Sequence, residues 1–345
     1  MSAELLPLIV GLPGPSAGDT EVGVLTAIRP AGIILFARNI VSSEQVRGLI
    51  KAFEALEPQP FICVDLEGGS VNRLAGLWGN LPSPARAAAQ GRRAVRALGV
   101  AAGAACRCLG IHLNLAPVVD LEAPEGMLGR EGRCFSDDPE RAATLAGVFA
   151  SGLGSWSVAG CLKHFPGLGP VPVDTHRQLP ELDLDAETMD RHLSPFATLS
   201  TAVPAIMMAH VVVPALGDAE RPASLSPTAV QKASTLPGSP VVLSDDIEMG
   251  ALDRWGDLGD RAVAALKASN HGVIVSASFD RLSEVADVIR REAEDDASLR
   301  QRVEHAASRL GTLRRDLYRT AAAVPAPDEE TVAQLWEQAR REATP

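Results

Sequence analysis

The sequence is poor in aromatic residues, which make up 4% of its 345 positions and include one tyrosine and four tryptophans. Few side chains are therefore available to stack on the bases of a single-stranded nucleic acid. No run of lysine or arginine forms a basic stripe, and the formal net charge is -11. Because basic contacts to phosphates provide most nucleic-acid affinity, this charge argues against nucleic acids and anionic membrane surfaces as partners.

Long hydrophobic runs are also missing. The apolar stretch nearest the N-terminus, residues 5–12, is short, contains Pro7 and follows no basic segment. We therefore expect neither a signal peptide nor a membrane span there. The cysteines are odd in number and scattered, which favours reduced thiols in the cytoplasm over a disulfide framework. They are Cys63, Cys106, Cys108, Cys134 and Cys161.

Two segments raise the question of a metal or a cofactor. Cys106 and Cys108, followed by His112, could be metal ligands, but they lie in an alanine-rich helical pattern and no second ligand pair follows. The core of a helix is the better interpretation. The glycine-rich stretch 11–18 contains two prolines and opens no convincing helix, so it is a poor dinucleotide loop. The sequence predicts no metal and no cofactor.

Short apolar, β-branched segments recur eight times, with longer helical patterns between them. In residues 43–56, for instance, Val46, Ile50 and Phe53 recur every three or four positions, as on one face of a helix. This alternation indicates a parallel α/β sheet, and eight repeats favour a (β/α)8 TIM barrel over an open doubly wound sheet. The predicted strands are 7–11, 32–36, 60–65, 112–117, 159–163, 204–209, 240–245 and 272–276. The other predicted helices are 84–109, one beginning at 139, 185–200, 226–235, 258–269, 280–293, 299–319 and 328–342.

No linker divides the chain into two domains. We expect a single barrel domain over residues 1–320 and a C-terminal helical tail over residues 321–345. The proline-containing stretch 322–328 predicts a turn that leads into the last charged helix. The tail is expected to pack on or beside the barrel.

Polar residues fall at the ends of the predicted strands. Charged groups at the end of an apolar strand are costly unless something pairs with them. In a barrel of this type the carboxyl ends of the strands meet at one face, where the loops carry the chemistry. Five of the eight strands end this way, so we expect one convergent polar pocket rather than separately solvated loop charges. The residues are Asp65, Asn114, Asp120, Lys163, His164, His210, Asp245 and Asp246.

The segments at these positions resemble the β-N-acetylglucosaminidases of glycoside hydrolase family 3, the single-domain bacterial type. The resemblance runs from about residue 8 to residue 280, with motifs in the same order and at compatible spacing. Lys163-His-Phe-Pro-Gly167 followed closely by Asp174-Thr-His176 is a specific signal. The other matching segments are 34–40, 64–69 with Arg73, 114–120, 132–135, 208–210 and 244–249.

The resemblance implies that Asp245 is the nucleophile, which attacks the anomeric carbon and forms a covalent glycosyl-enzyme. A strand end is a rigid mount for such an ionised carboxylate. Its neighbour Asp246 is the competing candidate, but adjacent side chains of an extended segment point to opposite sides, so only one is expected to face the pocket. A helix N-cap is the non-catalytic alternative for Asp245.

Most glycosidases use two carboxylates, whereas the resemblance implies a histidine on a mobile loop as acid/base, a position that His176 matches. Asp174 matches the position of the aspartate that partners this histidine. Side chains two positions apart in an extended loop point to the same side, so Asp174 can hold the imidazole of His176. A histidine with an ordinary pKa of about 6.5 can donate a proton in one step and accept one in the next. The alternative is that Asp174 and His176 lie in a surface loop and have no catalytic role.

By the same resemblance, sugar binding falls to five residues. Asp65 can accept hydrogen bonds from two adjacent sugar hydroxyls, and the basic side chains can donate to ring hydroxyls or to the acetamido carbonyl. An ion pair with Asp120 or Asp65 is the alternative for Lys163. His210 either contacts the sugar or satisfies the pocket rim. The five residues are Asp65, Arg73, Arg133, Lys163 and His164.

The chain departs from the family pattern after this motif. Leu168 stands where a second histidine is common, and Pro170 and Pro172 stiffen the loop that carries His176. We expect these residues to affect loop mobility and turnover rate, and not the identity of the catalytic groups.

The resemblance implies a retaining exo-β-N-acetylglucosaminidase that acts as a monomer on a small carbohydrate. Its substrate would be a cell-wall turnover fragment, N-acetylglucosamine joined to 1,6-anhydro-N-acetylmuramic acid, with or without peptide. The low aromatic content fits a small polar pocket for one terminal sugar. Two alternatives stay open: a β-glucosidase or phosphorylase that keeps the pocket, and a non-catalytic sugar-binding protein that keeps the fold.

Overall fold

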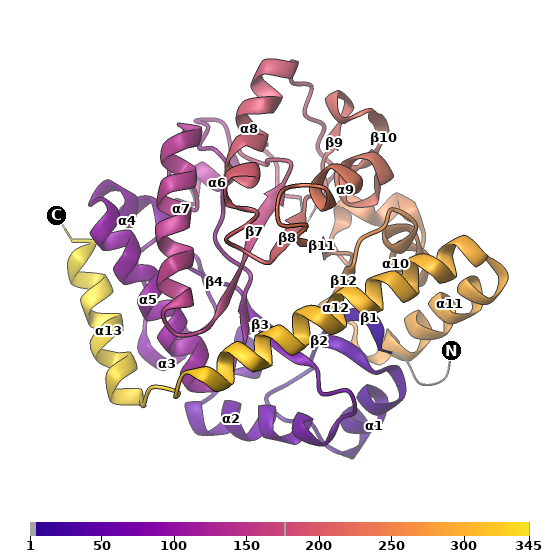
Figure 1. The fold of residues 1–345 in the computed structure, drawn as a ribbon, viewed down its shortest axis with the longest axis horizontal. Helices are drawn as coiled ribbons and strands as arrows, with labels where there is room; N and C mark the ends of the chain where they lie inside the picture. The colour runs from indigo at the N-terminus through magenta and orange to yellow at the C-terminus, as the bar shows by residue number, and fades with distance from the viewer. Residues whose placement is uncertain (1–4, 176, 345) are drawn as a thin grey trace.

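Eight parallel strands close into a barrel in the computed structural model, which describes residues 5–175 and 177–344 (Figure 1). Successive barrel strands are hydrogen-bonded neighbours, and β12 pairs with β1 to complete the circle. Each predicted strand overlaps one of them, so the predicted TIM barrel is confirmed and the open sheet is wrong. The strands are β1 (Leu6–Gly11), β2 (Pro30–Leu35), β3 (Phe61–Val64), β6 (Leu113–Asn114), β7 (Ala159–Phe165), β8 (Ala205–Met208), β11 (Val241–Asp246) and β12 (Gly272–Val275).

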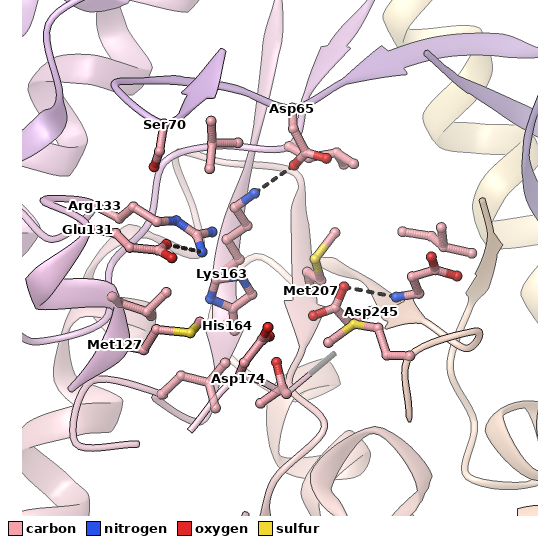
Figure 2. Close-up of a pocket in the computed structure, with 18 of the residues that line it drawn as sticks. Asp65, Ser70, Met127, Glu131, Arg133, Lys163, His164, Asp174, Met207 and Asp245 are labelled. Atoms are coloured by element: carbon pink, nitrogen blue, oxygen red, sulfur yellow. Dashed lines mark hydrogen bonds and ion pairs between the residues drawn. The ribbon is translucent and has the colours of Figure 1, made fainter. Parts of the chain in front are cut away.

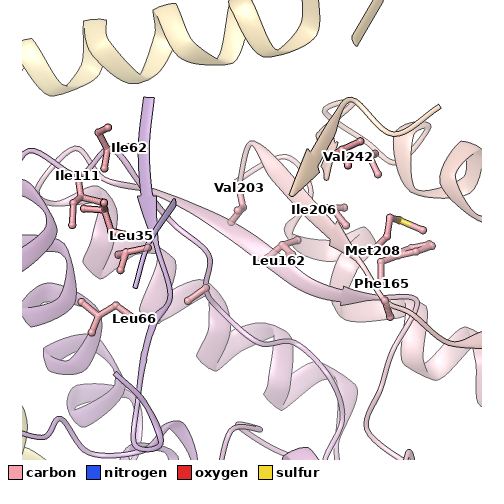
Figure 3. Close-up of a cluster of buried hydrophobic side chains, with 14 of the residues drawn as sticks. Leu35, Ile62, Leu66, Ile111, Leu162, Phe165, Val203, Ile206, Met208 and Val242 are labelled. Atoms are coloured by element: carbon pink, nitrogen blue, oxygen red, sulfur yellow. The ribbon is translucent and has the colours of Figure 1, made fainter. Parts of the chain in front are cut away.

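The barrel strands are mainly apolar because both of their faces are buried, and the polar residues of β6, β7 and β11 stand at their carboxyl ends. Side chains alternate between the two faces. Ile9, Ile34 and Met207 belong to the cluster that fills the barrel. Leu35 and Ile62 belong to a second cluster beneath the surrounding helices, part of which is drawn in Figure 3.

Helices cover the outside of the barrel between successive strands (Figure 1). Within the ranges that the structure describes, no helix is both long enough and apolar enough to cross a membrane. The helices of this layer are α1 (Asp19–Ile28), α2 (Ser43–Ala52), α5 (Arg92–Leu109), α7 (Pro139–Gly154), α8 (Ala186–Leu199), α9 (Pro227–Ser234), α10 (Leu258–Lys267) and α11 (Leu282–Asp295).

Two of these helices correct the sequence interpretation. The predicted helix 84–109 is broken into α4 (Pro84–Ala89) and α5, because Gly91 adopts a φ of +90°, which no helix allows. Helix α1 begins directly after the glycine-rich stretch, where the sequence predicts no helix. The N–H of Gly18 donates to Glu21 Oε2 at 2.8 Å and fixes this start. Only two residues of α1 are buried, so its apolar pattern is weak.

The long helix α12 (Ala297–Ala323) closes the N-terminal end of the barrel. Leu310, Leu313 and Leu317 pack into the cluster that fills the barrel. Polar groups of the same helix hold the segments that precede two strands. The Tyr318 hydroxyl donates to the carbonyl of Pro60 at 2.8 Å, and Arg309 donates to the carbonyl of Pro240 at 3.2 Å. This end of the barrel is therefore plugged, and any open pocket lies at the opposite end.

The last helix, α13 (Glu329–Glu342), packs on the outer layer against α5 (Figure 1). Trp336 is 1% exposed, and its ring centroid lies 5.6 Å from that of Trp78. Its indole Nε1 donates to the carbonyl of Gly79 at 3.2 Å. Helix α12 continues to Ala323, past the expected boundary at residue 320. We propose that residues 321–345 form a tail of the one barrel domain.

Replacing Trp336 by alanine is expected to lower the free energy of unfolding by about 3–5 kcal/mol, because the whole buried indole is lost. Urea denaturation followed by circular dichroism measures this loss. Trp336→Phe, which keeps most of the apolar volume, should lose less. A loss below about 1 kcal/mol for Trp336→Ala would show that α13 adds little to the fold.

Candidate active site

A cavity of about 340 Å³ opens at the C-terminal end of the barrel. Figure 2 shows Arg133, Lys163, His164 and Asp245 converging on it. The cavity lies where the polar strand ends predicted a pocket. Seven of the nine predicted site residues line it: Asp65, Arg73, Arg133, Lys163, His164, Asp174 and Asp245.

Four ionised side chains form a connected cluster in one wall of this cavity. Lys163 Nζ lies 2.7 Å from Asp65 Oδ1 and 2.7 Å from Glu67 Oε1. Arg133 binds the same glutamate with two hydrogen bonds of 2.8 Å, from Nε to Oε2 and from Nη2 to Oε1. An ion pair of Lys163 with Asp65 or Asp120 was the alternative to sugar binding, and the pair with Asp65 is present. Glu67 is a second partner that the sequence did not suggest.

Burial and pairing oppose one another in this cluster. Burial disfavours the charge on Glu67, but the adjacent Arg133 and Lys163 outweigh it and hold the pKa of this carboxyl far below its usual range. Burial likewise disfavours the charge on Lys163, but Asp65 and Glu67 outweigh it and raise the lysine pKa. The lysine and the glutamate are thus both ionised at neutral pH.

His164 is fixed by the carboxylate of Asp120. Its ring Nδ1 lies 2.8 Å from Asp120 Oδ2, which also accepts the His164 backbone N–H at 2.9 Å. The other oxygen of Asp120 accepts the backbone N–H of Leu168 at 2.6 Å. With Nδ1 held by the carboxylate, Nε2 of His164 is the ring nitrogen left for a ligand in the cavity.

Asp245 stands at the end of β11, as expected for a residue on a rigid mount. Its Oδ1 accepts the backbone N–H of Asp246 at 2.8 Å. Burial disfavours its charge, but His210, His164 and this hydrogen bond outweigh the burial, and the Asp245 pKa is lowered. The side chain is thus an ionised carboxylate in the cavity wall.

Asp246 also lines the cavity, so the expectation that only one of the two aspartates faces it is wrong. Its Oδ1 accepts the N–H of Glu248 at 3.1 Å, and Oδ2 accepts the Ser276 hydroxyl. The pairing of β11 with β12 shifts register between Leu243 and Asp246, where three residues of β11 stand against two of β12, and such a bulge ends the alternation on which the expectation rested. Because both oxygens have partners, Asp246 is the less suited of the two to attack a ligand.

Burial raises the pKa of Asp246 to about 6, although the Ser276 hydroxyl and the Glu248 N–H oppose it. A group whose pKa is raised on folding stabilises the fold fully below its unfolded pKa of about 4, and this stability is lost as the pH rises through about 6. An asparagine side chain in its place carries no charge at any pH. The change in the free energy of unfolding caused by Asp246→Asn should therefore be more favourable at pH 7 than at pH 4, by up to about 3 kcal/mol. Urea denaturation at the two pH values measures the difference, and equal effects at both would contradict it.

His210 is fully buried and is not among the residues that line the cavity. Its Nε2 donates to the backbone carbonyl of Asp246 at 2.9 Å, and its Nδ1 lies 2.7 Å from the Ser224 hydroxyl. The structure thus places His210 against the backbone of β11, which it supports at Asp246.

The remaining predicted residues belong to loops over the cavity. Arg73 follows the hairpin of β4 (Leu66–Gly68) and β5 (Val71–Asn72), with its guanidinium carbon 5.7 Å from the Phe36 ring centroid. The Asp174 side chain is 39% exposed, and its carboxylate lies 3.9 Å from Arg177 Nε. His176 lies outside the described residues, so its pairing with Asp174 stays a prediction.

The structure also bears on the metal alternative. Cys106 and Cys108 are buried in α5, and His112 accepts the N–H of Ile62 at 3.1 Å through Nδ1. In the two described ranges, no group of three or more histidine, cysteine, aspartate or glutamate side chains is arranged to hold a metal ion.

Comparisons with known proteins agree with this fold. The glycosyl hydrolase family 3 N terminal domain matches residues 10–310. A β-hexosaminidase from Idiomarina loihiensis is 34% identical over 277 residues, which cover 78% of this chain and 83% of that protein. A β-hexosaminidase from Pseudomonas aeruginosa is 37% identical over 243 residues, which cover 69% of this chain and 72% of that protein.

A solved structure extends the comparison to three dimensions. The glycoside hydrolase family 3 β-N-acetylglucosaminidase from a Paenibacillus species superposes with a TM-score of 0.85 at 27% identity. The superposition covers 98% of this chain and 67% of that one. With a family match over most of its length and relatives above 30% identity, the chain belongs to glycosyl hydrolase family 3.

Proposed function

We propose that the protein is a retaining exo-β-N-acetylglucosaminidase that removes terminal, non-reducing N-acetylglucosamine through a covalent glycosyl-enzyme. The observation that carries the proposal is the convergence of an ionised Asp245 with the Asp65–Lys163 ion pair and His164 around one small cavity. The names of the relatives, β-hexosaminidase and β-N-acetylglucosaminidase, support an acetamido sugar as substrate.

In the first step, Asp245 attacks the anomeric carbon while the bond from that carbon to the leaving oxygen breaks. His176, as an imidazolium, donates its proton to the leaving oxygen. Asp174, two residues earlier, holds the imidazole and stabilises its charge. The lowered pKa of Asp245 supports this role, since the nucleophile must be ionised at the pH where His176 is still protonated.

In the second step, the neutral imidazole of His176 takes a proton from water. The water oxygen attacks the anomeric carbon, and Asp245 leaves as a carboxylate. Each step inverts the configuration at this carbon, so the product retains that of the substrate.

The polar wall of the cavity would hold the sugar in place. Asp65 and Lys163 are 2.7 Å apart, so one sugar hydroxyl can donate to the carboxylate while a neighbouring hydroxyl accepts from the ammonium. Arg133 and His164 lie in the same wall and offer further polar contacts. A cavity of about 340 Å³, closed below by the packed barrel, fits a single terminal sugar better than an extended chain.

By its resemblance to the bacterial single-domain enzymes, we propose that the natural substrate is N-acetylglucosamine joined to 1,6-anhydro-N-acetylmuramic acid, with or without peptide. We propose a monomer that works in the cytoplasm. All five cysteines are buried and unpaired, which supports a reducing compartment.

The test is hydrolysis of p-nitrophenyl β-N-acetylglucosaminide beside the β-glucoside, with and without phosphate. The proposal predicts activity on the acetamido sugar alone, with no acceleration by phosphate. Equal activity on the glucoside would overturn the sugar assignment, and release of a sugar phosphate would indicate a phosphorylase. Folded protein that binds N-acetylglucosamine but hydrolyses neither substrate would indicate a non-catalytic sugar-binding protein.

A further inference from the structure

We propose that Glu67 is a positioning residue, whose buried carboxylate holds Lys163 and Arg133 in the orientation in which they bind the sugar. The inference rests on the proposed function and deepens it. Glu67 does not line the cavity, whereas Lys163 and Arg133 both do. Glu67 thus acts on the substrate only through these two side chains.

The contacts of Glu67 use both of its oxygens. Oε1 accepts from Lys163 Nζ at 2.7 Å and from Arg133 Nη2 at 2.8 Å, and Oε2 accepts from Arg133 Nε at 2.8 Å. The Glu67 side chain is 1% exposed, and those of Lys163 and Arg133 are 3% and 11% exposed. Two parallel bonds to one guanidinium fix its plane as well as its position.

The backbone that carries Glu67 is itself fixed. The Asn114 side chain accepts the N–H of Leu66 at 3.0 Å and donates to its carbonyl at 2.8 Å. Gly68 follows with a φ of +101°, and a Cβ there would lie 2.3 Å from the carbonyl oxygen of Pro82. Only glycine permits so close an approach, so the hairpin holds Glu67 at a set depth behind the cavity wall.

The other charges nearby explain what loss of Glu67 would do. Arg133 would keep Glu131, whose carboxylate is 3.7 Å away and 40% exposed, as a competing partner nearer to solvent. Lys163 would keep only Asp65 as an ion-pair partner at its 2.7 Å distance. That pair would tighten, so that both groups become less available to sugar hydroxyls. The two cations would leave the geometry that the sugar requires.

The experiment is a double-mutant cycle in kcat/KM on p-nitrophenyl β-N-acetylglucosaminide, with Glu67→Gln, Arg133→Ala and the double variant. Glu67→Gln keeps the shape and removes the charge. We expect it to lower kcat/KM about 100-fold, the loss typical of a misplaced binding group. In the Arg133→Ala background the same change should lower kcat/KM much less, since Arg133, one of the two side chains that Glu67 positions, is already gone. All assays run well below the unfolding temperature of each variant.

Leu310→Ala is the matched control for lost stability. It removes a fully buried side chain at the plugged end of the barrel, and its kcat/KM should equal that of the wild type. If Glu67→Gln does not fold, Glu67→Asp takes its place in the cycle, because the shorter carboxylate keeps the charge but not the reach. Its expected loss is about 10-fold, again smaller in the Arg133→Ala background.

Wild-type kcat/KM in the folded Glu67 variant, or losses that add fully with Arg133→Ala, would overturn the inference. A merely structural glutamate would instead behave as the Leu310 control does, with lower stability and a wild-type kcat/KM. A wild-type enzyme that hydrolyses no β-N-acetylglucosaminide would overturn the proposed function. In that case the same cycle is measured as N-acetylglucosamine affinity, and an unchanged affinity in Glu67→Gln overturns the inference separately.

Discussion

Replacing Asp245 by asparagine should lower kcat on p-nitrophenyl β-N-acetylglucosaminide by at least about 10⁴-fold, as removal of a nucleophile does in other covalent enzymes. The amide has nearly the shape of the carboxylate, so it fills the same place at the end of β11. It carries no negative charge and is a poor nucleophile, so the covalent step loses its attacking group. Steady-state kinetics of the purified variant measure the loss.

Asp246→Asn is the matched control, one residue further along the same strand. Both Asp246 oxygens already have partners in Ser276 and Glu248, so the amide can keep that framework at a much smaller cost in kcat. If the larger loss falls on Asp246→Asn instead, the two roles are reversed. If neither variant loses more than about 10-fold, the nucleophile is a different residue.

Replacing His176 by alanine should lower kcat/KM by about 10²–10⁴-fold on substrates whose leaving group needs a proton. The expected loss depends on the leaving group, because a dinitrophenolate departs without protonation whereas a sugar alcohol does not. On the dinitrophenyl glycoside, glycosylation should stay fast and hydrolysis of the covalent intermediate should become slow. Stopped-flow kinetics should then show a burst of dinitrophenolate followed by slow turnover.

Azide provides the control for this prediction. A small anion that needs no general base should react with the accumulated glycosyl-enzyme, restore turnover of His176→Ala and yield a glycosyl azide with retained configuration. Asp174→Asn should show a milder form of the same defect, since the imidazole remains but loses its charged partner. Equal losses on good and poor leaving groups, without rescue by azide, would contradict the acid/base role of His176.

The barrel could be predicted because its physics leaves a direct trace in the sequence. Strands that are buried on both faces must be apolar along their whole length, and each is followed by a polar end or a helix. The helix boundaries were harder to predict from the sequence. Gly91 splits one predicted helix through a backbone angle that composition does not reveal, and α1 buries only Leu25 and Ile28, too few for a clear periodic pattern.

The cavity residues could be predicted as a set because the strands of a parallel barrel end at one face. Lys163 and Asp65 form an ion pair, which is one of the interpretations that the sequence left open for Lys163. Glu67 was missed because it lies in a short hairpin beyond β3, and no local pattern says that this hairpin passes behind Lys163. The side of Asp246 was misjudged because a bulge between Leu243 and Asp246 interrupts the strand alternation.

Trapping the glycosyl-enzyme tests the central claim most directly. An N-acetylglucosaminyl fluoride with a second fluorine on its ring should form the covalent intermediate faster than water can hydrolyse it. We predict that the protein gains the mass of one fluorinated sugar residue, and that peptide fragmentation places it on Asp245. A label on another residue, or turnover with inverted configuration and no added mass, would contradict Asp245 as the nucleophile of a retaining enzyme.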